Sequence, residues 1–217
     1  MNAAVSKPLF VVLEGVEGSG KSTQVRLLGE WLAARGIPHV LTREPGGTQV
    51  GEEIRRALLH GGEVPARTEL LLMLAARSAF VEQVVRPALG RGDVVVADRY
   101  ELSSFAYQGH GRGLGLDAVR AANAFATGGL RPDLTVVIDV PAAEGAARVR
   151  GRGASADRIE QAGTDFHDAV ARAYRLLSES EPDVAVVDGT APAEAVHAAI
   201  VDLLGSRFPE TFGPAQG

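Results

Sequence analysis

One glycine-rich stretch constrains this chain more than any other feature. Residues 15–22 read Gly-Val-Glu-Gly-Ser-Gly-Lys-Ser and match the phosphate-binding pattern G-x-x-x-x-G-K-[ST] at every fixed position. The apolar, largely β-branched run Leu9–Leu13 before it predicts a buried strand. Residues 23–35 after it have apolar residues at helical spacing, and Gly36 is typical of a helix end. A strand, a glycine-rich loop and a helix in this order indicate a P-loop rather than a chance glycine-rich turn.

The chemistry of phosphate binding explains the residue types of this loop. Gly15, Gly18 and Gly20 leave backbone N–H groups free to approach an anion. The helix that follows points its positive end at the same place. Lys21 can reach the β- and γ-phosphates of a nucleotide, and Ser22 can bind Mg²⁺.

Length, charge and composition limit the other classes of function. The 217 residues can bury a substantial core, and we expect a single domain over 1–217 with at most a small lid. A net charge of −5 provides no basic surface for nucleic acid. Glu14 interrupts the apolar run after Lys7, so we expect neither a secretory signal nor a membrane span. The sequence has no cysteine, which excludes disulfides and thiolate chemistry and is compatible with a reducing cytoplasm.

Apolar runs alternate with helical segments along the chain. After the P-loop unit, strands are expected at 39–42, 93–97, 134–140 and 183–188, and helices at 49–59, 69–89, 117–127, 142–149, 166–177 and 194–204. Because the connections are helical, the strands should be parallel. The tail at 208–217 is rich in Pro and Gly and is expected to fray.

Two segments place charged residues where strands end, which is where open α/β sheets bind ligands. Asp98 and Arg99 follow one buried strand, and an acid there is typical of a carboxylate that organises Mg²⁺. A structural ion pair is the alternative. Arg43 follows another strand and would lie near the phosphates, although a solvated arginine in a turn explains it equally well.

The helix predicted over 69–89 carries a further pair of candidates. Thr68 is a plausible N-cap, and Pro87 should kink or end the helix. Met73 and Arg77 are four residues apart and therefore share a face. Spacing alone favours a core methionine and an arginine that extends its charged end to solvent.

Two later segments are rich in glycine or in arginine. Residues 103–108 (SSFAYQ) precede four alternate glycines at 109–115, which predict a mobile or tightly turned loop. Residues 148–160 hold four arginines among small residues, which fits either a solvated basic turn or a lid that closes over phosphates. These are Arg148, Arg150, Arg152 and Arg158.

Together these segments resemble bacterial thymidylate kinases over nearly the whole chain, from Phe10 to Leu204. The matching pieces are EGVEGSGKST (14–23), TREPGGTQ (42–49), AAR (75–77), DRY and SSFAYQGHGRG (within 98–113), RPDL (131–134) and DRIE (157–160). The P-loop alone indicates only a nucleoside triphosphate, whereas its combination with TREPGGT and DRY–AYQG is highly specific.

The resemblance implies a P-loop α/β fold with a five-stranded parallel sheet flanked by helices and a small lid, usually as a homodimer. It also implies transfer of the γ-phosphoryl group of ATP to dTMP, with Mg²⁺ held by Ser22 and Asp98. The implied ATP site comprises Gly15, Val16, Glu17, Gly18, Ser19, Gly20, Lys21, Ser22, Thr23, Arg148 and, beside the adenine, Asp188. The implied dTMP site comprises Glu17 near the sugar 3′-hydroxyl, Arg43, Pro45, Met73, Arg77 at the thymine edge, Arg99, Ser103, Ser104, Tyr107 and Gln108.

The implied catalytic residues are Glu17, Lys21, Asp98 and Arg99 together with arginines of the lid. Gly18 occupies the position where some members of the family carry a P-loop arginine, so the lid should supply the cation. Arg152, flanked by glycines, is the first choice and Arg158 the second. One residue departs from the family pattern: Met73 stands where phenylalanine commonly stacks on thymine, and a flexible thioether covers a base less rigidly.

Two alternatives remain open at this point. A kinase for dUMP or for several pyrimidine nucleotides would differ little in sequence, because apolar pockets distinguish a methyl group by only about 1–3 kcal/mol. A P-loop switch such as a small GTPase would need the guanine-reading Asn-Lys-x-Asp motif, and no Asn-Lys pair occurs in the chain. The sequence therefore favours a cytoplasmic nucleotide kinase that uses ATP and dTMP.

Overall fold

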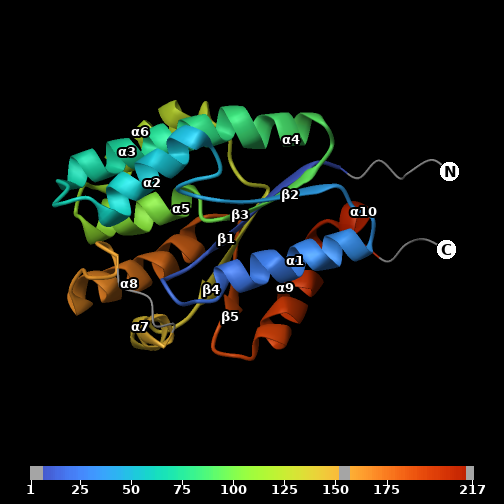
Figure 1. The fold of residues 1–217 in the computed structure, drawn as a ribbon. Coiled ribbons are helices and arrows are strands. Elements are labelled where there is room, and N and C mark those ends of the chain that lie inside the picture. The colour runs from blue at the N-terminus through green and yellow to red at the C-terminus, as the bar shows by residue number, and fades with distance from the viewer. Residues whose placement is uncertain (1–6, 152–156, 214–217) are drawn as a thin grey trace.

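The computed structural model describes residues 7–151 and 157–213. A five-stranded sheet lies at its centre, with the strand order β2-β3-β1-β4-β5. All neighbouring strands pair in parallel, as the helical connections predict. The strands are β1 (Leu9–Glu14), β2 (His39–Arg43), β3 (Val94–Asp98), β4 (Leu134–Asp139) and β5 (Val184–Asp188). The expected α/β fold with helices on both faces of a five-stranded parallel sheet is confirmed (Figure 1).

Strand β1 is the central strand, and its residues Leu9–Leu13 are completely buried. Successive side chains point to opposite faces, so both faces of the sheet must be covered. The register pairs Leu13 of β1 with Asp98 of β3, and Arg43 of β2 with the same Asp98. The carboxyl ends of three strands therefore meet at one edge, next to the P-loop.

Helices α1 (Lys21–Ala34) and α9 (Ala193–Arg207) cover one face of the sheet. The odd-numbered residues of β1, such as Val11, pack there against Leu28 of α1 and Ile200 of α9. Since α1 begins at Lys21, this packing fixes the position of the P-loop relative to the sheet.

A continuous helical stretch covers part of the opposite face: α3 (Ala66–Phe80), the π-helical η1 (Val81–Val85) and α4 (Arg86–Gly90). Two details differ from the sequence prediction. The helix begins at Ala66 after Pro65, so Thr68 is not its N-cap. The chain also stays helical beyond Pro87. Pro87 has no backbone N–H to donate, and the wider turn of the π-helical η1 directly before it accommodates the proline ring.

The other helices surround the edge of the sheet where the P-loop lies, or complete the two faces. They are α2 (Gln49–His60), α5 (Glu101–Ser104), the π-helical η2 (Phe105–Gly111), α6 (Leu116–Thr127), α7 (Ala142–Arg150), α8 (Thr164–Ser180) and α10 (Pro209–Phe212).

The prediction of a loop at the four glycines of 109–115 is wrong for its first part, up to Gly111. Residues 101–111 form α5 and η2, and Tyr107, Gln108 and Gly109 are buried. A Cβ added at Gly111 would lie 2.7 Å from the ring of Phe166, so this glycine allows η2 and α8 to approach closely. Only the following turn uses left-handed glycines, Gly113 among them.

The prediction of a frayed tail from residue 208 is also wrong for the described part, which ends at Gly213. Helix α10 packs on α1, where the ring of Phe212 lies 5.6 Å from that of Trp31. Arg35 donates hydrogen bonds to the carbonyl oxygens of Phe212 and Gly213. Aromatic side chains thus anchor the start of this tail, although its Pro and Gly content predicted that it would fray.

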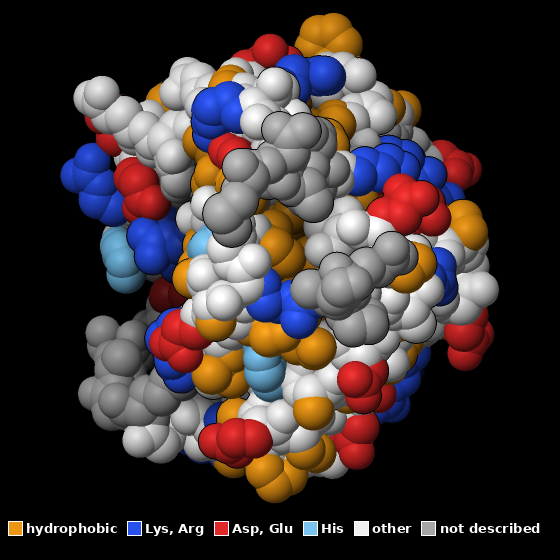
Figure 2. Space-filling view, turned by 90° about the vertical axis from the view of Figure 1, so that its right-hand side faces the viewer, with side chains coloured by type: hydrophobic (Ala, Val, Ile, Leu, Met, Phe, Trp, Pro, Cys, Tyr) orange, Lys and Arg blue, Asp and Glu red, His pale blue; other side chains and the backbone are white. Residues whose placement is uncertain are grey.

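In residues 7–151 and 157–213, no helix is long and apolar enough to cross a membrane. On the side of the molecule shown in Figure 2, acidic and basic side chains are interspersed.

Phe212→Ala should lower the free energy of unfolding by about 3 kcal/mol, because it removes a buried ring and leaves a cavity. Phe212 is 4% exposed. Leu176→Ala is the control, since Leu176 is 58% exposed on α8 and its loss should change stability by less than about 0.5 kcal/mol. Urea unfolding followed by circular dichroism measures both, and equal stability of the two variants would contradict a packed α10.

Candidate active site

The P-loop wraps around the start of α1. Gly15, Gly18 and Gly20 all have positive φ, which side chains other than glycine rarely adopt. A Cβ at Gly18 would also lie 2.2 Å from the carbonyl oxygen of Gly145 in α7. The loop therefore needs glycine both for its turn and for its contact with α7.

Lys21 lies folded into this loop. Its Nζ donates hydrogen bonds to the carbonyl oxygens of Gly15 (3.1 Å) and Val16 (2.8 Å), and it lies 3.4 Å from Ser19 Oγ. Burial lowers the pKa of Lys21 most strongly and the nearby Arg99 adds to this effect, so the pKa falls to about 8. A cation held among carbonyl oxygens at this pKa will gain from a phosphate that approaches it.

Arg99 connects the P-loop to η2 and α8. Its backbone has φ of 76°, and its guanidinium, on a side chain that is 12% exposed, pairs with Glu17 and donates to Gly15 O at 3.1 Å. Tyr174 Oη lies 3.2 Å from the same guanidinium. Burial would raise the pKa of Glu17, but Arg99 and Lys21 outweigh it and lower the pKa to about 2. Glu17 is therefore charged at neutral pH.

A second acid, Glu14, lies at the end of β1 and is fully buried. It accepts hydrogen bonds from the backbone N–H groups of Tyr100 (2.9 Å) and Ser103 (3.0 Å), and from Tyr174 Oη (2.8 Å). These contacts hold the start of α5 against the P-loop strand. The sequence analysis missed this role of Glu14, although an acid that ends an apolar strand was a visible signal.

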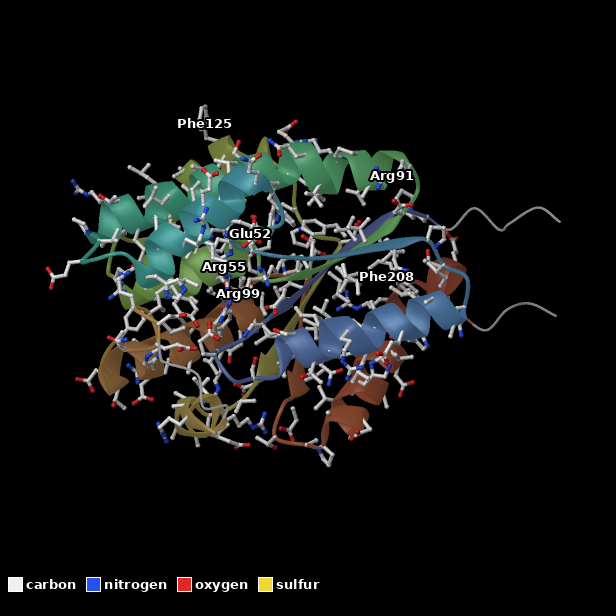
Figure 3. The ribbon with its side chains drawn as sticks, viewed as in Figure 1. Glu52, Arg55, Arg91, Arg99, Phe125 and Phe208 are labelled. Atoms are coloured by element: carbon white, nitrogen blue, oxygen red, sulfur yellow. The ribbon has the colours of Figure 1, made fainter. Side chains whose placement is uncertain are left out.

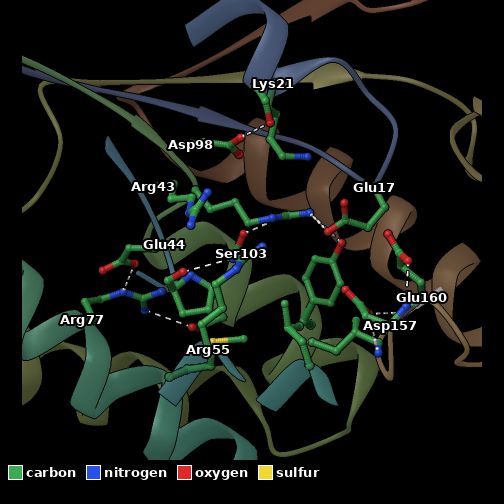
Figure 4. Close-up of a pocket in the computed structure, with 18 of the residues that line it drawn as sticks. Glu17, Lys21, Arg43, Glu44, Arg55, Arg77, Asp98, Ser103, Asp157 and Glu160 are labelled. Carbon is green, nitrogen blue, oxygen red and sulfur yellow. Dashed lines mark hydrogen bonds and ion pairs between the residues drawn. The ribbon is translucent and has the colours of Figure 1, made fainter. Parts of the chain in front are cut away.

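Ser22 and Asp98 meet across the cleft, with Ser22 Oγ donating to Asp98 Oδ2 at 2.6 Å (Figure 4). Two oxygen ligands next to a phosphate-binding loop fit Mg²⁺, which takes few protein ligands and completes its shell with water and phosphate. No cluster of three or more acidic or imidazole ligands occurs in the described part of the chain.

Arg77 is buried, at 3% exposure, so the expectation that its charged end reaches solvent is wrong. Its Nε donates to Glu44 Oε2 at 2.8 Å, and its Nη1 donates to Asn123 Oδ1 at 2.8 Å and Ser104 Oγ at 3.0 Å. Burial raises the pKa of Glu44 to about 7 against the opposing charge of Arg77. The second carboxylate oxygen of Glu44 has no hydrogen-bond partner among the described residues.

One cavity of about 280 Å³ joins the P-loop to this buried arginine. It brings together most of the residues expected at the site: Glu17, Gly18, Gly20, Lys21, Ser22, Arg43, Pro45, Met73, Arg77, Asp98, Arg99, Ser103, Ser104, Tyr107 and Gln108. Arg55 of α2 also lines it and donates to Pro45 O at 3.1 Å. Arg55 was not among the residues predicted for the site, since no recognised motif includes it.

Arg43 combines both of its expected environments. It lines the cavity, yet its side chain is largely exposed and pairs with Glu52 at 3.1 Å. Figure 4 shows Arg43 between Asp98 and Glu44.

The remaining predicted residues lie outside the cavity lining. Arg148 lies against the outer side of the P-loop, where it donates to Gly189 O (3.0 Å) and to Gly18 O (3.5 Å). Asp188 is exposed and accepts hydrogen bonds from Thr190. Thr23 is exposed at the third position of α1, whereas Gly15, Val16 and Ser19 are buried within the loop itself.

Two arginines, Arg152 and Arg158, were expected to act from a lid. Arg158 pairs with Glu69 at 2.7 Å and donates to Leu58 O at 2.8 Å, so the structure does not bring it to the P-loop. Arg152 lies outside the described residues.

Comparison with known proteins assigns the chain to a family. The family model described as thymidylate kinase matches residues 13–200. The thymidylate kinase of Lactobacillus delbrueckii subsp. bulgaricus is 45% identical over 94% of this chain and 98% of its own length. That of Alkalilimnicola ehrlichii is 47% identical over 91% of this chain and 92% of its own length. That of Pseudomonas putida is 47% identical over 90% of this chain and 96% of its own length.

The chain belongs to the thymidylate kinase family. It is therefore a nucleoside monophosphate kinase, a transferase that phosphorylates dTMP to dTDP with ATP, and the resemblance noted in the sequence is confirmed.

ATP binding should be linked to proton uptake through Lys21. Near pH 9, most Lys21 side chains are neutral before binding, and contact with phosphate should protonate them, with an uptake of about one proton per ATP. Near pH 7 the lysine is already charged, so the uptake should fall to about a tenth of that. Titration calorimetry in buffers of different ionisation enthalpy measures this difference, and equal uptake at both pH values would refute it.

Proposed function

We propose that the cavity binds dTMP between Arg77 and Glu17 and receives the γ-phosphoryl group of ATP from the P-loop end. The observation that carries this proposal is the continuity of one cavity from Lys21 and Ser22 to Met73 and Arg77. Donor and acceptor nucleotides can therefore meet without crossing a protein wall, as direct phosphoryl transfer requires.

Catalysis in this site consists of positioning and charge stabilisation. Negative charge on the transferred phosphoryl oxygens is met by Lys21 and the P-loop N–H groups on the donor side. Arg99 provides a cation on the acceptor side, and its five hydrogen-bonding neighbours fix it before the substrate arrives. Arg43 and Arg55 extend the positive charge along the wall that the acceptor phosphate would face.

Ser22 and Asp98 would hold Mg²⁺ in this proposal. The ion supplies charge neutralisation between the β- and γ-phosphates when it is bound. The residues Arg148 and Asp188 are proposed to flank the adenine, since Arg148 joins Gly18 of the P-loop to Gly189, the residue after Asp188. The catalytic contribution of Arg152 or Arg158 stays a prediction of the sequence.

Met73, Arg77, Ser104 and Gln108 would surround the base of dTMP. Met73 lines the cavity and packs against the apolar cluster under η2, so one thioether can serve both the core and the base. Arg77 Nη2 donates one N–H to Tyr100 O at 2.9 Å, and its second N–H would face a carbonyl oxygen of the thymine edge.

A homodimer in the cytoplasm completes the proposal. Phe125 of α6 is 92% exposed and Leu71 of α3 is 64% exposed, and α3 packs on α6. Phe125 projects away from the body of the molecule (Figure 3). A second copy of this face would cover both side chains.

The function is tested by an ADP-release assay with dTMP, dUMP, dCMP and dGMP as acceptors. We expect turnover with dTMP to exceed that with every other acceptor. A preference for dUMP or dCMP would support the broader pyrimidine kinase instead. Slow hydrolysis of the triphosphate that no acceptor accelerates would support a P-loop switch.

Glu17→Gln should weaken the binding of dTMP more than the binding of ATP. Glu17 lies between the two expected nucleotides and pairs with Arg99, so a neutral amide loses its contact with the acceptor and loosens the arginine. We expect KM for dTMP to rise at least about tenfold and KM for ATP to change less than about threefold. Steady-state kinetics with each nucleotide varied in turn measures both KM values. An equal rise in the two KM values would mean that Glu17 acts by supporting the structure of the P-loop instead.

A further inference from the structure

Glu69 is a buried acid that the mechanism above does not use. It lies in the first turn of α3 and is 1% exposed. Its carboxylate accepts hydrogen bonds from three side chains of two other segments: Gln108 Nε2 at 2.8 Å, Arg112 Nη2 at 3.1 Å and Arg158 Nη2 at 2.7 Å. A single carboxylate thus joins η2 to the segment that begins at residue 157.

The charge of Glu69 is stabilised where it lies. Burial would raise the pKa of this carboxyl group, but hydrogen bonds from Arg112, Gln108 and Arg158 outweigh it and lower the pKa below its usual value. The group is therefore a carboxylate at neutral pH, which can accept hydrogen bonds and cannot donate them.

This fact fixes the orientation of the Gln108 side-chain amide. Only the NH₂ end of an amide can donate to a carboxylate, so Gln108 Nε2 must face Glu69 and Oε1 must face the other way. Gln108 lines the cavity, and its Oε1 accepts no side-chain hydrogen bond from the described residues. The end of Gln108 left for a ligand is hence an acceptor.

We propose that Glu69 is a positioning residue that sets base selectivity by holding Gln108 with its carbonyl oxygen toward the nucleobase. The inference rests on the proposed binding of dTMP in this cavity. Thymine offers one N–H donor, at N3, beside a carbonyl acceptor at C4. Gln108 Oε1 and the Arg77 donors match that order, whereas cytosine presents an acceptor at N3 and a donor at C4.

Arg158 gives Glu69 a second way to shape the same cavity. Arg158 donates to Leu58 O through its side chain and to Leu59 O through its backbone N–H, at 2.8 and 3.1 Å. Its neighbours Asp157, Ile159 and Glu160 line the cavity wall. The Glu69–Arg158 pair therefore ties this wall to the same carboxylate that holds Gln108 of η2.

Glu69→Gln tests the assignment with almost no change in volume. An amide at position 69 would turn its oxygen to the arginines and its NH₂ group toward Gln108, which could then invert. We expect KM for dTMP to rise and the inhibition constant of dCMP to fall, so that the dTMP-to-dCMP preference narrows at least about tenfold. The dTMP-to-dUMP preference should stay unchanged, because these bases share the same edge. KM for ATP should stay within about twofold.

Glu181→Gln is the matched control. Glu181 is also a shielded acid that bridges two arginines, Arg120 at 2.5 Å and Arg131 at 2.7 Å, but it does not line this cavity. The dTMP-to-dCMP preference of the Glu181→Gln variant should equal that of the unmodified enzyme. If Glu69→Gln does not fold, Glu69→Asp keeps the charge and shortens the reach, and the preference should narrow in the same direction.

An unchanged dTMP-to-dCMP preference in a folded Glu69 variant would overturn the inference. An equal loss of affinity for dTMP and for dCMP would overturn it as well. The dTMP turnover of the unmodified enzyme is measured first, because its absence would instead refute the proposed function.

Discussion

The ion pair of a largely enclosed arginine, Arg99 at the end of β3, is the interaction on which the rest of the site depends. Glu17 lies in the P-loop, where burial raises the pKa of its carboxyl group, so its carboxylate needs a positive charge beside it. Arg99 supplies this charge while it contacts the P-loop carbonyl of Gly15 and the side chain of Ser103. Its left-handed backbone is a strained conformation that persists because these contacts surround it. The P-loop, η2 and α8 are held in one arrangement by the same side chain.

Much of the fold could be predicted because the strong signals were local. Each strand of the sheet is a short apolar run between turn residues, and the helical connections imply parallel pairing. The errors arose where glycine or proline had a tertiary role. Gly111 permits close packing against Phe166 rather than a turn, and Phe212 anchors a tail that composition alone marks as loose. Neither contact is visible at short range in the sequence.

The candidate site shows the same division. Lys21, Asp98 and Arg99 belong to motifs whose backbone position already specifies their place, and the structure brings them together. Arg77 was assigned to the correct helix but to the wrong environment, because its partner Glu44 is 33 residues away in the sequence. Tyr174 and Glu69 were missed for the same reason, since their charged and polar partners come from distant segments. Periodicity identifies the face of a helix, whereas the polar groups opposite that face depend on the folded chain.

The contact between Gly18 and Gly145 has a consequence for how motion reaches the phosphates. The two backbones touch with no side chain between them, since a Cβ on Gly145 would lie 2.3 Å from the carbonyl oxygen of Glu17. Interdigitating side chains can absorb a small displacement by changing rotamer, but two peptide groups in contact have no such freedom. A shift of α7 by a fraction of an ångström would therefore be transmitted to the P-loop almost undiminished. In mechanical terms, α7 and the phosphate-binding loop form a rigid coupling.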